Sequence, residues 1–340
     1  MLSATTSPDV GPSALAPSSP ACVNATFVTL LTGVRYAAAA ACLPKQLRFV
    51  NSTCPLLLVY NDADSSLPLP MLRDAYGAHR MLPLRRLKAR YNRTRHARHE
   101  APPVSGAGRR LFATAAEAAN THQKLWLWAL PIKGRAVFLD IDILLFRNID
   151  ALLEIAPTPQ TDGRPGLGAV TCKSKYGERY FNSGVLVFTP SLRALEQLLM
   201  YQHFASGLWH GHVPHLGDAW PNICAPIDDP FRAVRMFPNS SRPLGECRNR
   251  HGPGRQPGMM SKACESKLTD QSIFNSVFTR HTAIPRSFNL AAGNVDEPTN
   301  RIMHFVGEPK PWSDNPFSGR SSEPLRRHAT QEWRRRCLPA

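Results

Sequence analysis

Two aspartates interrupt an otherwise apolar run at residues 137–146, and this run constrains the fold more than any other feature of the chain. In a β-strand, positions i and i+2 share a face, so Asp140 and Asp142 point the same way while Ile141 points to the other face. Neighbouring carboxylates in apolar surroundings repel each other and lose hydration unless a cation neutralises them. Because Mg²⁺ and Mn²⁺ prefer carboxylate oxygens, the run predicts a divalent metal site at the end of a buried strand. The alternative is a turn in which the two aspartates cap backbone amides.

Strands and helices alternate along the chain, which indicates an α/β protein. Strands are predicted over residues 26–31, 56–60, 136–139, 167–171, 184–188 and 301–305, and helices over 36–50, 71–78, 192–204 and 269–278, with a further helix around Lys124. This alternation is typical of a doubly wound, mostly parallel sheet, in which ligands bind at the carboxyl ends of the strands. Asp150 precedes a short apolar stretch and is expected to be a helix N-cap.

The composition predicts one large domain flanked by two tails. Residues 1–22 are rich in Pro, Ser and Ala and are expected to form a disordered tail. Residues 23–317 are expected to form a single domain, and residues 318–340 a basic C-terminal tail. Two segments without steady periodicity, near 85–110 and 205–266, are expected to be loop insertions.

The formal net charge of +16 is concentrated in two short segments. Residues 85–99 contain seven Lys/Arg and no acid, and residues 326–336 contain five Arg and one Glu. Tyr91 is the one aromatic residue of the first segment, so the stacking platform of a single-strand binder is missing and nucleic acid is not an expected partner. No stretch approaches the ~20 apolar residues of a transmembrane helix, so no membrane span is expected.

The cysteines, the N-terminus and the sequons are compatible with more than one cellular compartment. None of the eight cysteines forms a C-x-x-C pair, so a zinc site of that spacing is not expected, whereas disulfides within the 205–266 insertion are compatible with an oxidising compartment. The absence of a signal-peptide pattern favours the cytoplasm. Four N-x-S/T sequons, at Asn24, Asn51, Asn92 and Asn239, favour instead a secretory route such as the Golgi lumen.

Residues 138–150 resemble the D-x-D block of family 8 glycosyltransferases, the glycogenin-like enzymes. Five more segments resemble blocks of this family in the same order. They are residues 27–36 (first strand and uridine-binding turn), 124–128 (helix before the D-x-D strand), 181–185 (Asn-Ser-Gly block), 270–275 (Asp-Gln helix) and 304–312 (metal and diphosphate block). The resemblance covers residues 26–312 with two interruptions and implies the nucleotide-sugar-binding glycosyltransferase-A-type fold.

The resemblance also implies a reaction: retaining transfer of a hexose from a UDP-sugar donor to a hydroxyl of a carbohydrate or polyol acceptor. Negative charge develops on the departing diphosphate, and a metal held by Asp140, Asp142 and His304 would stabilise it. The mixed carboxylate and imidazole set favours Mn²⁺, with Mg²⁺ as the alternative. A homodimer is an open alternative for the assembly.

Roles for further residues come from the same resemblance. It implies donor binding by Thr29, Thr32, Tyr36, Asp140, Ile141, Asn182, Ser183, Gly184, Gly307 and Lys310, and catalytic roles for Lys124, Asp270 and Gln271. Structural alternatives stand beside several of them. Tyr36 could be a core tyrosine, Lys124 a solvated lysine and Asp270 a helix cap.

The sequence departs from the glycogenin pattern in three respects. Lys267 stands where an acidic residue is expected, Gly33 replaces a turn Asn, and no tyrosine lies between Asn289 and His304. Self-glucosylation is therefore not expected. A non-catalytic nucleotide-sugar-binding protein is the alternative function.

Overall fold

The computed structural model describes residues 22, 24–97, 122–160, 163, 165–173, 179–209, 270–278, 280–291, 300–306, 309–317 and 324–338. Outside these residues lie positions 1–21 of the first predicted tail, Gly307, Lys267 and most of the expected 205–266 insertion. No helix within the described part combines the length and the apolar character needed to cross a membrane.

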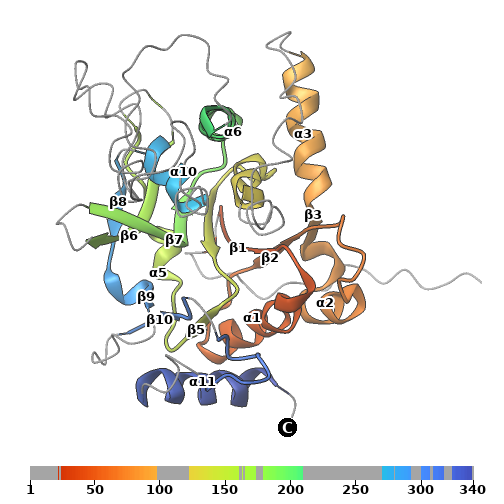
Figure 1. Cartoon of the computed structure of the whole chain (residues 1–340), viewed down its shortest axis with the longest axis vertical. Helices are drawn as coiled ribbons and strands as arrows, with labels where there is room; N and C mark the ends of the chain where they lie inside the picture. The colour runs from red at the N-terminus through yellow and green to blue at the C-terminus, as the bar shows by residue number, and fades with distance from the viewer. Residues whose placement is uncertain are drawn as a thin grey trace, which may run out of the picture.

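A mixed seven-stranded sheet forms the centre of the molecule (Figure 1). Its order is β3 (Met81–Pro83), β2 (Leu56–Tyr60), β1 (Ala25–Leu31), β4 (Arg135–Leu139), β7 (Arg179–Phe188), β6 (Leu167–Lys173) and β8 (Thr282–Ile284). Strands β3, β2, β1 and β4 are mutually parallel, β6 and β8 are parallel, and β7 runs antiparallel to both of its neighbours. The predicted α/β class with a mostly parallel sheet is confirmed.

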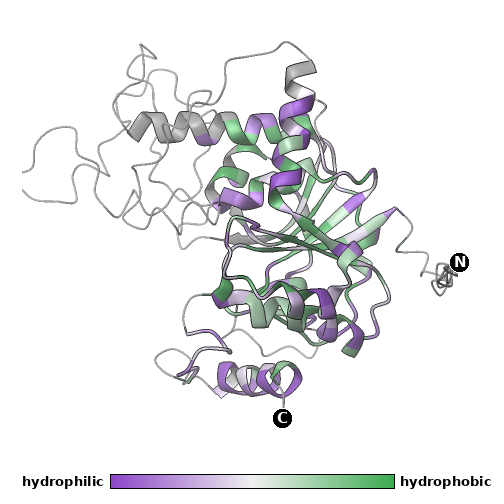
Figure 2. Ribbon diagram, turned by 90° about the vertical axis from the view of Figure 1, so that its right-hand side faces the viewer, coloured by the Kyte–Doolittle hydropathy of each residue, from purple (hydrophilic) through white to green (hydrophobic). Residues whose placement is uncertain are grey.

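Both faces of this sheet are covered, which explains why its strands are apolar at consecutive positions. In β1, Phe27 and Leu31 face one core while Val28 and Leu30 face the other. Helices α1 (Ala37–Phe49) and α2 (Leu69–Tyr76) cover the first face. The other face carries α3 (Leu84–Ala97), the 3₁₀ helix η5 (Gln123–Ala129), α6 (Leu192–Trp209) and α10 (Asp270–Val277), and Figure 2 shows helices on both sides of the sheet.

A second, three-stranded sheet brings the C-terminal half of the chain to the D-x-D segment. It has the order β5 (Ile143–Leu145), β10 (Ile302–His304) and β9 (Leu290–Ala291). Strand β10 is antiparallel to β5, and His304 pairs with Ile143. This register places His304 beside the residue that follows Asp142.

The expectation of a loop near 85–110 is wrong for residues 85–97, which belong to α3. Leu84, Leu87 and Tyr91 are buried in the core of the second sheet face. Their spacing of three and four residues is that of one helix face, and the many basic residues between them obscured it. Arg90 also holds α3 against the end of η5, since its Nη1 donates to the carbonyls of Ala129 and Leu130 at 2.7 and 2.8 Å.

The basic C-terminal segment also differs from the expected tail, because residues Pro324–Cys337 form helix α11. Trp333 is completely buried, and Arg336 Nη1 donates to the carbonyl of Leu145 at 2.6 Å. A disulfide joins Cys337 to Cys42 in α1. The helix is therefore part of the folded body, on the outer side of α1 (Figure 1).

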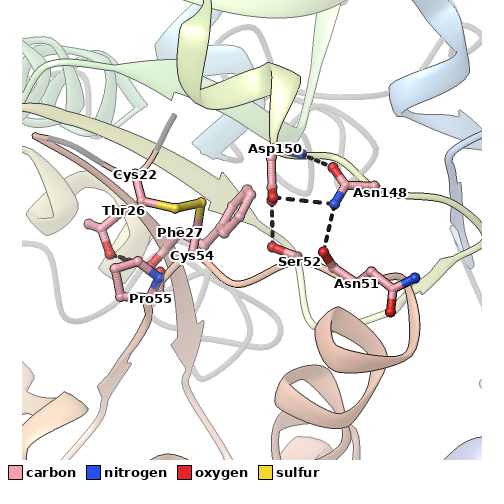
Figure 3. The surroundings of a disulfide bond; sticks show 9 residues. All are labelled: Cys22, Thr26, Phe27, Asn51, Ser52, Cys54, Pro55, Asn148 and Asp150. Atoms are coloured by element: carbon pink, nitrogen blue, oxygen red, sulfur yellow. Dashed lines mark hydrogen bonds between the residues drawn. A yellow bond between two sulfur atoms is a disulfide. The ribbon is translucent and has the colours of Figure 1, made fainter. Parts of the chain in front are cut away.

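Asp150 occupies the predicted N-cap position before α5 (Ala151–Glu154), but it does not cap the helix with its side chain. Its carboxylate instead accepts hydrogen bonds from Ser52 Oγ at 2.5 Å and Asn148 Nδ2 at 3.2 Å. A second disulfide, Cys22–Cys54, lies near this cluster (Figure 3).

Candidate metal centre

Two segments that are distant in sequence, residues 140–142 and the end of β10, bring Asp140, Asp142 and His304 together at the carboxyl end of β4. His304 Nε2 lies 3.1 Å from Asp142 Oδ1 and 3.6 Å from Asp140 Oδ2. One potential ligand atom from each residue lies within 4.8 Å of the others. The backbone holds the segment on both sides, since Asp140 N donates to the Gly184 carbonyl and Phe305 N donates to the Asp142 carbonyl, each at 2.8 Å.

A chain of amide groups fixes the tautomer of His304. The backbone N–H of Gly184 donates to Asn182 at 2.8 Å, which identifies the accepting atom as Oδ1. Asn289 must then donate its Nδ2 to the same oxygen, at 2.7 Å, so that its own Oδ1 faces His304 Nδ1 at 3.1 Å. An acceptor opposite Nδ1 requires that Nδ1 carry the proton, which leaves the lone pair of the neutral ring on Nε2.

The resulting donor set fits a hard divalent cation. Two carboxylates and the Nε2 lone pair converge, and each of them is an acceptor that repels the others. Carboxylate oxygen with imidazole nitrogen suits Mn²⁺, and the hydrogen-bonded Nδ1 is the arrangement usual for ligating histidines. The Asp142 carboxylate raises the pKa of His304 although burial opposes the shift, so the pocket attracts positive charge.

Two lysines bind the outer oxygens of the aspartates. Lys124 Nζ lies 3.0 Å from Asp140 Oδ1 and 2.9 Å from Asp270 Oδ2. Lys310 Nζ lies 2.5 Å from Asp142 Oδ2 and also donates to the carbonyl of Phe305 at 2.6 Å. Burial alone would lower the pKa of Lys124, but the Asp140 and Asp270 carboxylates outweigh it and the pKa is raised.

The two aspartates differ in pKa because their neighbours differ. Burial raises the pKa of Asp140, and the nearby Asp142 charge adds to the shift against the opposing effect of Lys124. Burial acts on Asp142 in the same direction, but His304 and Lys310 overcome it and lower its pKa. Ionised Asp142 is therefore favoured by the fold, while ionised Asp140 is disfavoured in the absence of a further cation.

Helix α10 presents the predicted Asp-Gln pair to the Asn-Ser-Gly block of β7. Ser183 Oγ donates to Asp270 Oδ2 at 2.8 Å, and Gln271 Oε1 accepts from Asn182 Nδ2 at 3.1 Å. Asn275 holds the helix in place, because its amide makes two 2.9 Å bonds with the backbone N–H and carbonyl of Phe181. Asp270 thus reaches the metal centre through Lys124.

Several residues predicted to bind substrate also make contacts within the fold. Thr29 is completely buried and donates to the carbonyl of Leu139 at 2.8 Å, which supports the strand that leads to Asp140. The side chain of Ile141 is buried in the core. Tyr36 is half-buried and makes an edge-on contact with Trp312 at 5.7 Å, and Thr32 is half-buried after the end of β1.

Gly184 has a packing role that sequence reasoning did not identify. A Cβ at this position would lie 2.5 Å from Cε1 and Nδ1 of His304 and 2.8 Å from Asn182 Oδ1. Glycine therefore permits the close approach of the imidazole to β7. Sequence reasoning also missed Asn289, whose contacts arise from segments 107 and 15 residues away.

Comparisons with known proteins give partial similarities. No protein-family model matches the chain. Glycogenin-1 from Mus musculus and glycogenin-1 from Oryctolagus cuniculus are each 37% identical over 86 residues, which cover 25% of this chain and 22% of those proteins. The chain thus matches about a fifth of the length of these relatives.

Solved structures resemble the chain at low sequence identity. The galactosyltransferase LgtC, in complex with donor and acceptor sugar analogs, is 16% identical with a TM-score of 0.44, covering 92% of this chain and 99% of that one. The glycosyltransferase GlyE of Streptococcus pneumoniae is 16% identical with a TM-score of 0.45, covering 93% and 61%. These similarities do not assign the chain to a family.

Proposed function

We propose that the protein is a Mn²⁺-dependent glycosyltransferase that transfers a hexose from a UDP-sugar to an acceptor hydroxyl with retention. The observation that carries the proposal is the convergence of Asp140, Asp142 and His304 on one point at the carboxyl edge of the sheet. Ligands of open α/β sheets bind at this edge. The six sequence blocks that resemble family 8 glycosyltransferases, and the partial match to glycogenin-1, support the same reading.

The residues around this point have complementary roles in the proposed reaction. Asp140, Asp142 and His304 would hold the ion, whose chemistry when bound is to neutralise the charge of the departing diphosphate. Lys310 presents a second positive charge at the same place and would bind a phosphate oxygen. Lys124 holds Asp270 beside the centre, while Asn182 and Gln271 offer neutral amides suited to sugar hydroxyls.

A screen of UDP-sugars in the presence of Mn²⁺ tests this function, with donor hydrolysis and thermal stabilisation as readouts. We expect one UDP-sugar to raise the melting temperature and to be slowly hydrolysed, and both effects to require Mn²⁺. The alternative of a non-catalytic nucleotide-sugar-binding protein, suggested by Lys267, predicts stabilisation without hydrolysis. If no UDP-sugar binds with Mn²⁺ present, the proposed function is wrong.

A further inference from the structure

Asparagines inside and outside the N-x-S/T sequons differ in exposure. The three sequon asparagines in the described part of the chain, Asn24, Asn51 and Asn92, are all exposed, and none of their side-chain amides has a hydrogen-bond partner there. The described asparagines outside sequons are Asn61, Asn148, Asn182, Asn275, Asn289, Asn300 and Asn315, of which only Asn315 is exposed. The fold therefore leaves room for a bulky group at each described sequon.

The turn after α1 presents the sequon of Asn51 outward. Its middle residue, Ser52, is buried and donates to the Asp150 carboxylate, so that Asn51 and Thr53 on either side are exposed. Asn51 has a left-handed φ of 57° and accepts a hydrogen bond from Asn148 Nδ2 at its backbone carbonyl. Figure 3 shows the Asn51 amide directed away from this cluster.

Two disulfides give an independent indication of the compartment. Cys54, which directly follows the sequon of Asn51, is bonded to Cys22, and Cys42 is bonded to Cys337. Disulfides form and persist in oxidising compartments and are rare in the cytosol. N-glycosylation of sequons likewise belongs to secreted proteins.

We infer that Asn51 is N-glycosylated and that the protein folds in an oxidising secretory lumen, with Asn24 and Asn92 as further acceptors. In the modification, Asn51 Nδ2 forms a bond to C1 of a lipid-diphosphate-linked oligosaccharide. The bond from C1 to the diphosphate breaks, the lipid diphosphate leaves, and the amide proton passes to a base. Each disulfide forms by giving two electrons and two protons to a protein disulfide oxidant.

A glycan at Asn51 is compatible with the metal centre. Asn24 and Asn51 precede β1 and β2, which are parallel to each other, and β4 is parallel to β1. Both asparagines therefore lie toward the amino edge of the sheet, whereas Asp140 follows the carboxyl end of β4. The glycan would occupy the edge opposite the site, so its loss should not alter metal binding.

The test uses the full-length protein purified from its native cells, with a thiol-alkylating reagent present from lysis onward. Peptide:N-glycosidase in ¹⁸O water converts a glycosylated Asn51 into ¹⁸O-labelled Asp, which mass spectrometry detects. We expect this label at Asn51, and Cys22–Cys54 and Cys42–Cys337 as linked peptides without reduction. Recovery of unlabelled Asn51 would overturn the modification, and alkylation of all four cysteines would overturn the oxidising compartment.

Sequon variants expressed in the same cells provide matched controls. Asn51→Gln and Thr53→Ala should each remove one glycosidase-sensitive step in gel mobility, while Thr53→Ser, which retains the sequon, should keep it. Persistence of that step in Thr53→Ala would exclude Asn51 as the acceptor. All three variants should bind Mn²⁺ as the wild type does.

Discussion

Asn289 provides a sharp test of the metal centre, because it touches no proposed ligand atom and yet determines which nitrogen of His304 is protonated. In Asn289→Ala the acceptor opposite His304 Nδ1 is removed, together with the 2.7 Å bond to Asn182. The neutral ring can then carry its proton on Nε2, which faces Asp142. Binding of a metal ion must first reverse this tautomer.

The expected magnitude follows from these contacts. Loss of a hydrogen-bond partner of a ligating histidine weakens metal binding by about 10–100-fold, or about 1.4–2.7 kcal/mol. Asn182 Oδ1 keeps its bond from the Gly184 N–H, so the amide oxygen is not left unsatisfied. The free energy of unfolding should therefore fall by only about 1–3 kcal/mol.

Isothermal titration with Mn²⁺ measures the affinity, and thermal unfolding of the same samples measures stability. Asn289→Asp retains an acceptor opposite Nδ1 and is the matched control. It should bind Mn²⁺ more tightly than Asn289→Ala by about 10-fold or more, which is the lower end of the effect expected for a lost hydrogen-bond partner. Wild-type Mn²⁺ affinity in a folded Asn289→Ala would refute the tautomer argument.

Four further variants test Mn²⁺ binding and the stability of the fold. Asp140→Asn and Asp142→Asn should both weaken Mn²⁺ binding by titration, but Asp142→Asn should lower the melting temperature more, because the fold favours the ionised form of Asp142 alone; equal melting temperatures would contradict this. Gly184→Ala should displace His304 and weaken Mn²⁺ binding, with a loss of about 1–3 kcal/mol in unfolding free energy; unchanged Mn²⁺ affinity would show that the contact is not needed. Burial lowers the pKa of His281, so its neutral ring contributes fully to the free energy of unfolding above about pH 6.5, and this contribution is lost as the pH drops through the lowered pKa. Denaturant unfolding of His281→Phe should lack this loss. A pH profile identical to that of the wild type would contradict the role given to His281.

Local patterns predicted most of the central sheet. Continuous apolar runs marked β1, β2 and β4, because strands buried on both faces need no polar alternation. Helix α3 was missed because its three buried side chains are interspersed with basic residues, of which Arg85, Arg86 and Lys88 are exposed. Helix α11 was read as a tail for the same reason, although Ala329, Trp333 and Cys337 recur every fourth residue and are buried.

The candidate site was predictable where its chemistry is local and not where it depends on tertiary contacts. Asp140 and Asp142 stand two residues apart in one strand, so their shared face could be read directly. Asn289 acquires its place from the pairing of β9 with β10 and from a contact to β7, which no local pattern encodes. Asp150 likewise found a partner in Ser52, 98 residues away, instead of the adjacent helix.

The central claim is that Asp140, Asp142 and His304 hold one divalent ion. Crystals of the full chain grown with MnCl₂ and UDP, measured at the manganese absorption edge, test it most directly. The account predicts one anomalous peak within bonding distance of a carboxylate oxygen of each aspartate and of His304 Nε2, and no peak there in crystals of the doubly substituted Asp140→Asn, Asp142→Asn protein. The account would be contradicted if manganese bound elsewhere in the crystal, no manganese peak lay between the three residues, and Lys310 remained paired with Asp142.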